Sequence, residues 1–438
     1  MRRLKLFALL PLAIASLTAA RCSSLGPEAG SDSISILSYN VSNLFDDRDD
    51  GGEYPEFSIA AGKWSAARFR ERLERVSEAV LEALPSERGA DGRGVRGAGP
   101  DILCLVEVEN ENALDALLDG PLVKSAYRYR AMSRASGSAV NCALASRFPI
   151  KAIRSHSFAL GAAGSASGGS TTGGSREGRR LLEVELEVRG RSLTVFVCHW
   201  KSKLGGGAET EAERIGAAAL LSSRAAVLMA ADPEAEFLAA GDFNEGPDEY
   251  LLVGRKYATA LFPVEEVAPV SAEGRAGGGG ASGSGDSAAL EENPAGEPGV
   301  SGGGSGGSGG GSGDAVAVVD EAASEEAAVS RFADGLLVSM DPERAGFFEG
   351  RPVLYSPWGP SKGFSYAYEG RRERIDGFLL SPGLLDAKGA AFDDFSVVDA
   401  AFLLDSKGFP LGWKPGRSGG YSDHLPIALE LAVEALKE

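Results

Sequence analysis

Polar side chains stand directly after apolar, strand-like runs at six places in this sequence. They are Tyr39-Asn40, Glu107 in LVEVEN, His199 in CHWKSK, Gly241-Asp242-Phe243-Asn244-Glu245, Arg374-Ile375-Asp376 and Ser422-Asp423-His424. Binding and catalytic residues are commonly built at strand ends along one rim of a sheet. The chain has three histidines, and two of them, His199 and His424, lie in these segments. We therefore expect the six segments to meet at one site.

The acidic members of this set are suited to a hard divalent cation. Glu107 and Asp423 are carboxylates, the ligand type that Mg²⁺ or Mn²⁺ prefers. Such a cation can neutralise a non-bridging oxygen and the charge on the leaving group when a phosphodiester is hydrolysed. The sequence thus favours a metal-assisted attack of water on a phosphate ester.

The same chemistry needs groups that handle the water and the phosphoryl oxygens. Asp242 is suited to orient the water or accept its proton, and Asn244 is suited to donate to a phosphoryl oxygen. His424 with Asp376 behind it would make an imidazole–carboxylate pair, in which the carboxylate fixes the tautomer and raises basicity. His199 offers a second donor.

Taken one at a time, these segments have structural interpretations. The run at 241–244 favours a turn. A lone Glu107 would ordinarily be paired with an arginine, because an unpaired buried carboxylate is costly. His156, the third histidine, lies within an expected strand with no accompanying motif, and we interpret it as structural. Only the combination of segments favours a reaction site.

The elements that must position these residues are mostly strands. Helical spacing of apolar residues predicts helices at 64–84, 112–118 and 209–229. This pattern favours a layered α/β sandwich over a doubly wound parallel sheet. Alternating or continuous apolar runs predict strands at 33–39, 101–108, 140–146, 152–160, 180–188, 193–199, 236–240, 336–339, 375–380, 395–403 and 425–431.

Two segments rich in glycine and serine interrupt the pattern, at about 161–178 and 271–325. They hold few large apolar residues, so they cannot bury a core and should be flexible. Because site segments lie on both sides of each, we interpret them as insertions in a single domain at 33–438. The net charge of −18 argues against a broad basic surface for nucleic acid. It does not argue against an enzyme that contacts phosphates through a bound cation.

Residues 1–22 are typical of an export signal. A short basic stretch precedes an apolar run at 6–17, which is too short to span a bilayer, and small residues follow it. Cys22 resembles a bacterial lipoprotein attachment site, although Arg21 stands where a small residue is usual, and plain cleavage after Ala20 is the alternative. We expect an exported protein that is periplasmic, secreted or anchored to the cell surface by a lipid on Cys22. No later segment suggests a membrane span.

The three cysteines beyond Cys22 each lie inside an apolar run. Cys104, Cys142 and Cys198 match no zinc-binding spacing. We expect buried free thiols, with a disulfide between two of them as the alternative.

The motifs as a group resemble those of the endonuclease/exonuclease/phosphatase superfamily. That superfamily includes deoxyribonuclease I, apurinic endonucleases, sphingomyelinases and inositol-polyphosphate phosphatases. The likeness is greatest to a bacterial branch of exported nucleases and runs from about Ile34 to the C-terminal strand. It rests on YNVSNLF at 39–45, VEVEN at 106–110, HWKS at 199–202, GFSY at 363–366 before Ile375-Asp376, and GYSDHLP at 420–426.

The resemblance implies a deoxyribonuclease I-like, four-layer α/β sandwich. In this fold two packed, mostly antiparallel sheets are flanked by helices, and the site lies at one edge of both sheets. The resemblance also implies a role for each residue. Glu107 would bind the metal with Asn40 and Asp423 close by, Asn40, Asn244 and His199 would contact the phosphate, Asp242 would act on the water, and Asp376 would support His424.

The resemblance leaves several points open. Either Asp242 or His424 would be the base, and one or two ions would act. Val106 stands where a glutamine is common, and 134–141 lacks the acidic and arginine residues that are often present, so the substrate class is open. We expect a monomeric exported nuclease that acts on nucleic acid. The alternatives are a phosphomonoesterase, a sphingomyelinase-like phosphodiesterase, or a surface lipoprotein that uses the fold as a binding module.

Overall fold

The computed structural model describes nine stretches of the chain, which form two large sheets and the helices outside them. Residues 1–22 with Cys22, and the 271–325 insertion, lie outside these stretches, as does 161–177 of the first insertion. The described residues are 33–83, 86–88, 94–95, 99–133, 138–159, 178–267, 335–359, 362–414 and 419–433.

The first sheet has six strands in the order β18-β19-β1-β4-β6-β5. Its neighbours are antiparallel except for the parallel pair β1 and β4 at its centre. The strands are β1 (Ser33–Leu44), β4 (Ile102–Val108), β5 (Tyr129–Met132), β6 (Asn141–Ser146), β18 (Ala390–Val397) and β19 (Ile427–Val433).

The second sheet has nine strands, with eight in the order β11-β12-β14-β17-β10-β9-β8-β7 and β13 paired to β14. At its centre β10 is parallel to β9 and antiparallel to β17. The strands are β7 (Ile150–His156), β8 (Leu181–Val188), β9 (Arg191–His199), β10 (Phe237–Asp242), β11 (Leu261–Pro263), β12 (Leu336–Ser339), β13 (Gly346–Phe348), β14 (Arg351–Tyr355) and β17 (Asp376–Leu380).

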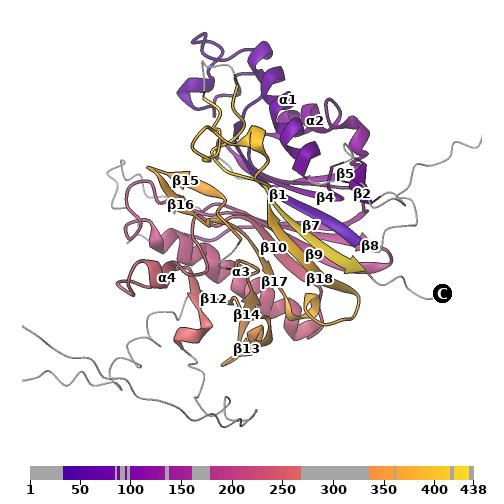
Figure 1. Cartoon of the computed structure of the whole chain (residues 1–438), viewed down its shortest axis with the longest axis vertical. Coiled ribbons are helices and arrows are strands. Elements are labelled where there is room, and N and C mark those ends of the chain that lie inside the picture. Colours follow the sequence, from indigo (N-terminus) through magenta and orange to yellow (C-terminus); the bar gives the residue numbers. More distant parts are fainter. Residues whose placement is uncertain are drawn as a thin grey trace, which may run out of the picture.

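Helices cover the outer faces of both sheets, so the molecule has four layers (Figure 1). The apolar side of α1 (Ala66–Ala83), together with α2 (Glu111–Leu118), packs on the odd-numbered residues of β4 such as Leu103 and Leu105. The helix α3 (Glu211–Ala231) packs on Phe196 of β9 and its neighbours. A third apolar core lies between the sheets. The α/β sandwich of two packed, mostly antiparallel sheets is therefore confirmed.

Helix α3 has the length and composition that a membrane span would need, although the sequence suggested no such segment after the N-terminus. It is the one helix of the described residues that meets this condition. Its small apolar residues Ala217, Ala218 and Ala225 are buried against the second sheet with Leu221. The buried face of the helix is thus accounted for by packing against the second sheet.

The expected strand at 395–403 is wrong in its bounds. The strand β18 ends at Val397, and Ala401–Leu403 forms a 3-10 turn. The apolar residues of 395–403 continue through the turn without a change in composition, so the sequence does not mark the boundary. The beginning of β18 was missed because a β-bulge between Phe392 and Asp394 breaks the alternation.

The remaining histidine and the cysteines are as expected from the sequence. The His156 Nε2 lies 2.7 Å from the Glu183 Oε2 on the neighbouring strand, outside the site segments. Cys104, Cys142 and Cys198 are buried free thiols. Burial raises the pKa of each of these thiols, that of Cys142 to about 12.

Candidate active site

Four of the polar site residues continue the faces of the strands that form the core between the sheets. In β9, Val195 and Val197 belong to this core, and His199 is the next residue on the same face. The same alternation carries β10 to Asp242, β17 to Asp376 and β1 to Asn40. These side chains therefore cap the inter-sheet core at one edge of both sheets.

The second sheet holds three of these residues side by side. Asp242 is in register with His199 of β9 on one side and with Asp376 of β17 on the other. The close approach of β9 and β10 requires Gly241, whose φ is +141°, because a Cβ there would lie 2.0 Å from the Cys198 carbonyl oxygen. The Gly-Asp pair of the motif is thus needed for the local backbone as well as for its carboxylate.

Glu107 reaches the site through an irregularity in β4. By simple alternation it would face the helices with Leu103 and Leu105. Instead its φ is +67°, and the pairing with β6 shifts register between Val106 and Val108. A bulge of this kind re-aims a side chain, and a left-handed non-glycine residue is typical of functional sites. The backbone is therefore strained where the carboxylate joins the site.

Asn40 joins the two sheets at the site. Its Nδ2 donates to the Glu107 Oε1 at 3.2 Å and to the Asp242 Oδ2 at 3.0 Å, and it lies 3.4 Å from the His424 Nε2. The Nε2 of His199 lies 3.5 Å from the Glu107 Oε1 and 3.9 Å from the Asp242 Oδ2. Segments that are up to 384 residues apart in sequence thus meet within hydrogen-bonding distance.

His424 and Asp376 form an imidazole–carboxylate pair. The His424 Nδ1 lies 2.7 Å from the Asp376 Oδ2, and its Nε2 lies 4.0 Å from the Asp242 Oδ2. Burial alone would lower the pKa of His424, but the charge and hydrogen bond of Asp376 raise it well above its usual value. At His199 burial, Arg179 and His424 instead lower the pKa well below its usual value. One imidazole is thus held charged and the other neutral.

The carboxylates of the site fit a divalent cation. Burial raises the pKa of Glu107, and the nearby Asp423 raises it further. Burial and Asp376 raise the pKa of Asp242 to about 7. Asp423 is exposed, so its carboxylate is accessible, and its charge acts on Glu107. Buried carboxylates with raised pKa values are a donor set that a hard cation would stabilise.

A different group of described residues satisfies the distances for a metal. One ligand atom each from Asp242, Asp376 and His424 lies within 4.8 Å of the others. Within this group the His424 Nδ1 is already in contact with the Asp376 Oδ2 at 2.7 Å. That contact suits proton handling better than metal ligation, so the set around Glu107 is the better metal candidate.

Asn244 is placed beside the site by the turn after β10. Its φ is +53°, and its backbone nitrogen donates to the Asp242 Oδ1 at 2.8 Å. Its Nδ2 donates to the Trp200 carbonyl oxygen at 3.1 Å. The amide expected to contact the phosphate is therefore tied to the chain segment that follows His199, with one of its two hydrogens engaged.

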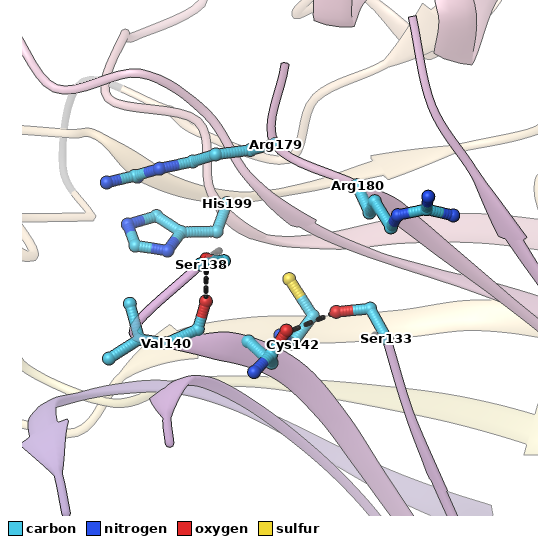
Figure 2. Close-up of a pocket in the computed structure, with 8 residues that line it drawn as sticks. Ser133, Ser138, Val140, Cys142, Arg179, Arg180 and His199 are labelled. Atoms are coloured by element: carbon cyan, nitrogen blue, oxygen red, sulfur yellow. Dashed lines mark hydrogen bonds between the residues drawn. The ribbon is translucent and has the colours of Figure 1, made fainter. Parts of the chain in front are cut away.

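Arg179, which lies at the rim of the site, was not predicted from the sequence. Figure 2 shows its guanidinium beside the ring of His199, on a small recess also lined by Ser133 and Cys142. Its Nη1 donates to the Trp200 carbonyl oxygen at 2.5 Å, and its charge lowers the pKa of Glu107 after burial has raised it. Arg179 follows the first glycine-rich insertion without any motif, so only the fold brings it here.

Arg72 of α1 supports the site from behind. It is fully buried, its Nη1 donates to the Tyr421 carbonyl oxygen at 2.7 Å, and its Nη2 donates to the Val41 carbonyl oxygen. These carbonyls flank Asn40 and the Asp423-His424 pair. The sequence feature that could have indicated Arg72 is its position between the apolar residues Phe69 and Val76 of an amphipathic helix.

Ser365 connects the two partners of the imidazole–carboxylate pair. Its carbonyl oxygen accepts from the Leu425 nitrogen at 2.7 Å, and its Oγ accepts from the Asp376 nitrogen at 3.1 Å. The ring of Tyr366 lies on the imidazole of His424, with centroids 4.6 Å apart. The GFSY motif thus has a structural purpose that the sequence did not reveal.

The comparison with family models identifies one family. The model of the Endonuclease/Exonuclease/phosphatase family matches residues 35–258. No curated protein matches the chain.

The solved structures to which the chain is similar have low sequence identity and TM-scores below 0.5. TDP2 from Caenorhabditis elegans is 13% identical, with 92% of this chain and 74% of that one covered and a TM-score of 0.42. A family protein from Bacteroides thetaiotaomicron is 12% identical, with coverage of 92% and 98% and a TM-score of 0.41. Beta toxin from Staphylococcus aureus is 16% identical, with coverage of 90% and 99% and a TM-score of 0.39.

Proposed function

This chain belongs to the Endonuclease/Exonuclease/phosphatase family and is a hydrolase of the phosphoesterase type, and we propose that it is an exported, divalent-metal-dependent nuclease. One observation carries the proposal. Asn40 is in contact with Glu107, Asp242 and His424 at once, so a carboxylate for a metal, a carboxylate for water and a charged imidazole surround one point.

The metal would be held by Glu107 and Asp423, with Asn40 close by, and Mg²⁺ or Mn²⁺ is the ion that these oxygens favour. When bound, the ion supplies charge neutralisation at the phosphoryl group. The residues of the site are compatible with one or two ions, and titration of the protein with Mg²⁺ would give the number that bind.

The chain's own residues would divide the remaining work. Asp242, whose pKa is about 7, is the base that orients and deprotonates the water. His424 is charged and donates from its Nε2 to a phosphoryl oxygen, while Asp376 holds its Nδ1. His199 and Asn244 contact the phosphate from the side of the second sheet, and Arg179 adds positive charge there.

An assay panel tests this function. Purified protein is given plasmid DNA, bis(p-nitrophenyl) phosphate, sphingomyelin and inositol phosphates, each with Mg²⁺, Mn²⁺ or EDTA. We expect metal-dependent cleavage of DNA and of the small diester, and loss of both in His424→Ala. Hydrolysis confined to sphingomyelin or to inositol phosphates would favour the lipid-directed or phosphomonoesterase alternatives.

The binding-module alternative makes a different prediction. A surface lipoprotein that only uses the fold would show no Mg²⁺ binding by isothermal titration and no hydrolysis of any substrate. Activity that survives both EDTA and His424→Ala would contradict the proposed mechanism.

Export and lipid attachment are separate parts of the proposal. The basic and apolar stretches of 1–22 and the position of Cys22 support them. Mass spectrometry of the mature N-terminus would distinguish a lipid on Cys22 from plain cleavage after Ala20. A mature protein that retains Met1 would contradict export through this signal.

A further inference from the structure

A short hairpin extends from the active site. Its strands are β15 (Tyr366–Tyr368) and β16 (Arg371–Glu373), shown at the edge of the molecule in Figure 1. The turn residues Glu369 and Gly370 have φ of +49° and +79°, as in a tight two-residue turn. Such a turn gives the hairpin a defined shape.

One face of this hairpin continues the active site outward. Tyr366 pairs with Glu373 and Tyr368 pairs with Arg371, so these four side chains share a face. The ring of Tyr366 lies on His424. Tyr368 and Arg371 are therefore the next pair along the face that meets the catalytic imidazole, about 7 Å farther along the strand.

The hairpin is held in place from both sides. The Lys203 Nζ contacts the Glu373 Oε2 at 3.3 Å, which offsets the one acidic charge on this face. On the opposite face the Arg372 guanidinium lies over the ring of Phe364 at 4.5 Å. Tyr368 and Arg371 remain exposed, the former at 53%.

The exposed pair at the tip of the hairpin is an aromatic ring beside a positive charge, on a chain with a net charge of −18. Arginine binds phosphate oxygens, and an aromatic ring can stack on an unpaired base. A nucleic-acid strand has both groups in every nucleotide. A phospholipid surface offers the phosphates but no base for Tyr368.

We propose that Tyr368 and Arg371 form a subsite that binds a single strand of nucleic acid next to the scissile phosphate, with a phosphate on Arg371 and a base on Tyr368. This inference rests on the proposed nuclease function. It adds the substrate form, a single-stranded or unpaired segment, and the direction in which the strand leaves the site.

Binding is measured without cleavage. A fluorescently labelled single-stranded 12-mer is titrated with full-length protein in EDTA at several salt concentrations, for wild type, Arg371→Glu and Tyr368→Ala. Lys388→Glu is the matched control, because it reverses an exposed positive charge far from the site. Lys388 contacts Glu234, which precedes β10, whereas Asp242 lies at the other end of that strand. Hydrolysis of bis(p-nitrophenyl) phosphate is followed in parallel.

We expect Arg371→Glu to weaken oligonucleotide binding about tenfold or more and to reduce the salt slope by about 0.7, the value for one phosphate contact on a single strand. Tyr368→Ala should weaken binding about fivefold or more, because stacking contributes about 1–3 kcal/mol per base. Both variants and Lys388→Glu should hydrolyse the small diester as wild type does.

Other results would overturn the inference. Affinities equal to that of Lys388→Glu would mean that the hairpin does not bind the strand. If wild-type protein hydrolyses the small diester but does not bind the 12-mer, the proposed subsite is excluded, whereas the phosphodiesterase activity is retained. A loss in the two variants of binding to phosphatidylglycerol vesicles, with oligonucleotide binding unchanged, would identify a membrane as the partner.

Discussion

The pair formed by His424 and Asp376 has a natural control elsewhere in the molecule. His156 and Glu183 make a second imidazole–carboxylate contact, and both contacts are 2.7 Å long. Only the first lies among the site residues. Asp376→Asn and Glu183→Gln each remove one charge and keep the shape of the side chain, so they separate a catalytic role from a structural one.

The expected size of the catalytic effect follows from the contact. A hydrogen bond to a charged group contributes about 1.5–3 kcal/mol, and each 1.36 kcal/mol corresponds to about tenfold in rate. Loss of the bond alone would therefore lower kcat about 10- to 150-fold. Without the charge of Asp376 the pKa of His424 would fall, so the imidazole would lose the charge with which it donates to the phosphoryl oxygen. One such donor is worth about 10²–10³ in kcat, and we expect Asp376→Asn to lower kcat by about 10²–10³.

The assay is hydrolysis of bis(p-nitrophenyl) phosphate with saturating Mg²⁺, together with thermal unfolding of each variant. Glu183→Gln should keep kcat within about threefold of wild type, although it lowers the melting temperature, because Glu183 is buried among Arg154, Arg224 and His156. The reasoning fails if Asp376→Asn retains nearly full kcat while folded, or if Glu183→Gln lowers kcat as much.

Three further outcomes are expected. At 100 times its dissociation constant Mg²⁺ should raise the free energy of unfolding of the wild type by about 2.7 kcal/mol. Glu107→Gln should not be stabilised in this way, and an equal stabilisation of the variant would exclude Glu107 as a ligand. Tyr366→Phe should keep kcat while Tyr366→Ala lowers it about 2- to 10-fold, because the ring that packs on His424 is worth about 0.5–1.5 kcal/mol; equal losses in both would implicate the hydroxyl instead. Burial would raise the pKa of Glu183, but hydrogen bonds and charges from Arg224 and His156 hold this pKa below its usual value. The ionised carboxylate therefore stabilises the fold at pH values above its usual pKa, and this stabilisation is lost as the pH falls. The gap in melting temperature between wild type and Glu183→Gln should therefore narrow on acidification, and a gap that is constant with pH would contradict this.

Alternation made much of the fold and part of the site predictable. A strand that buries every second residue between two sheets directs the residue at its end to the same side, as with Val195, Val197 and His199. The long helices were predictable because their apolar spacing is regular, and α1 lies within the range expected. The short strands β13 and β11 could not be predicted, because three residues carry no period.

The residues that were missed act through contacts that no local pattern encodes. Arg179 reaches His199 only because β8 lies beside β9. Arg72 donates to backbone carbonyl oxygens that are 31 and 349 residues away in the sequence. Every residue has a backbone carbonyl, so the sequence does not indicate which ones will accept. Ser365 likewise acts by accepting hydrogen bonds from two backbone nitrogens, those of Leu425 and Asp376.

The direction of the Glu107 side chain does not follow from the alternation of its strand. Alternation alone would have turned this carboxylate toward α1 and α2, away from Asn40. The bulge and the left-handed φ of +67° reverse its direction, and Val108 then takes its place in the outer core. Such a conformation costs about 1–3 kcal/mol in a residue other than glycine. A chain that required Glu107 only for folding would have no reason to keep this strain, because a regular strand with an apolar residue would bury the position at lower cost. The strain is therefore best explained by the need for a carboxylate at the centre of the site.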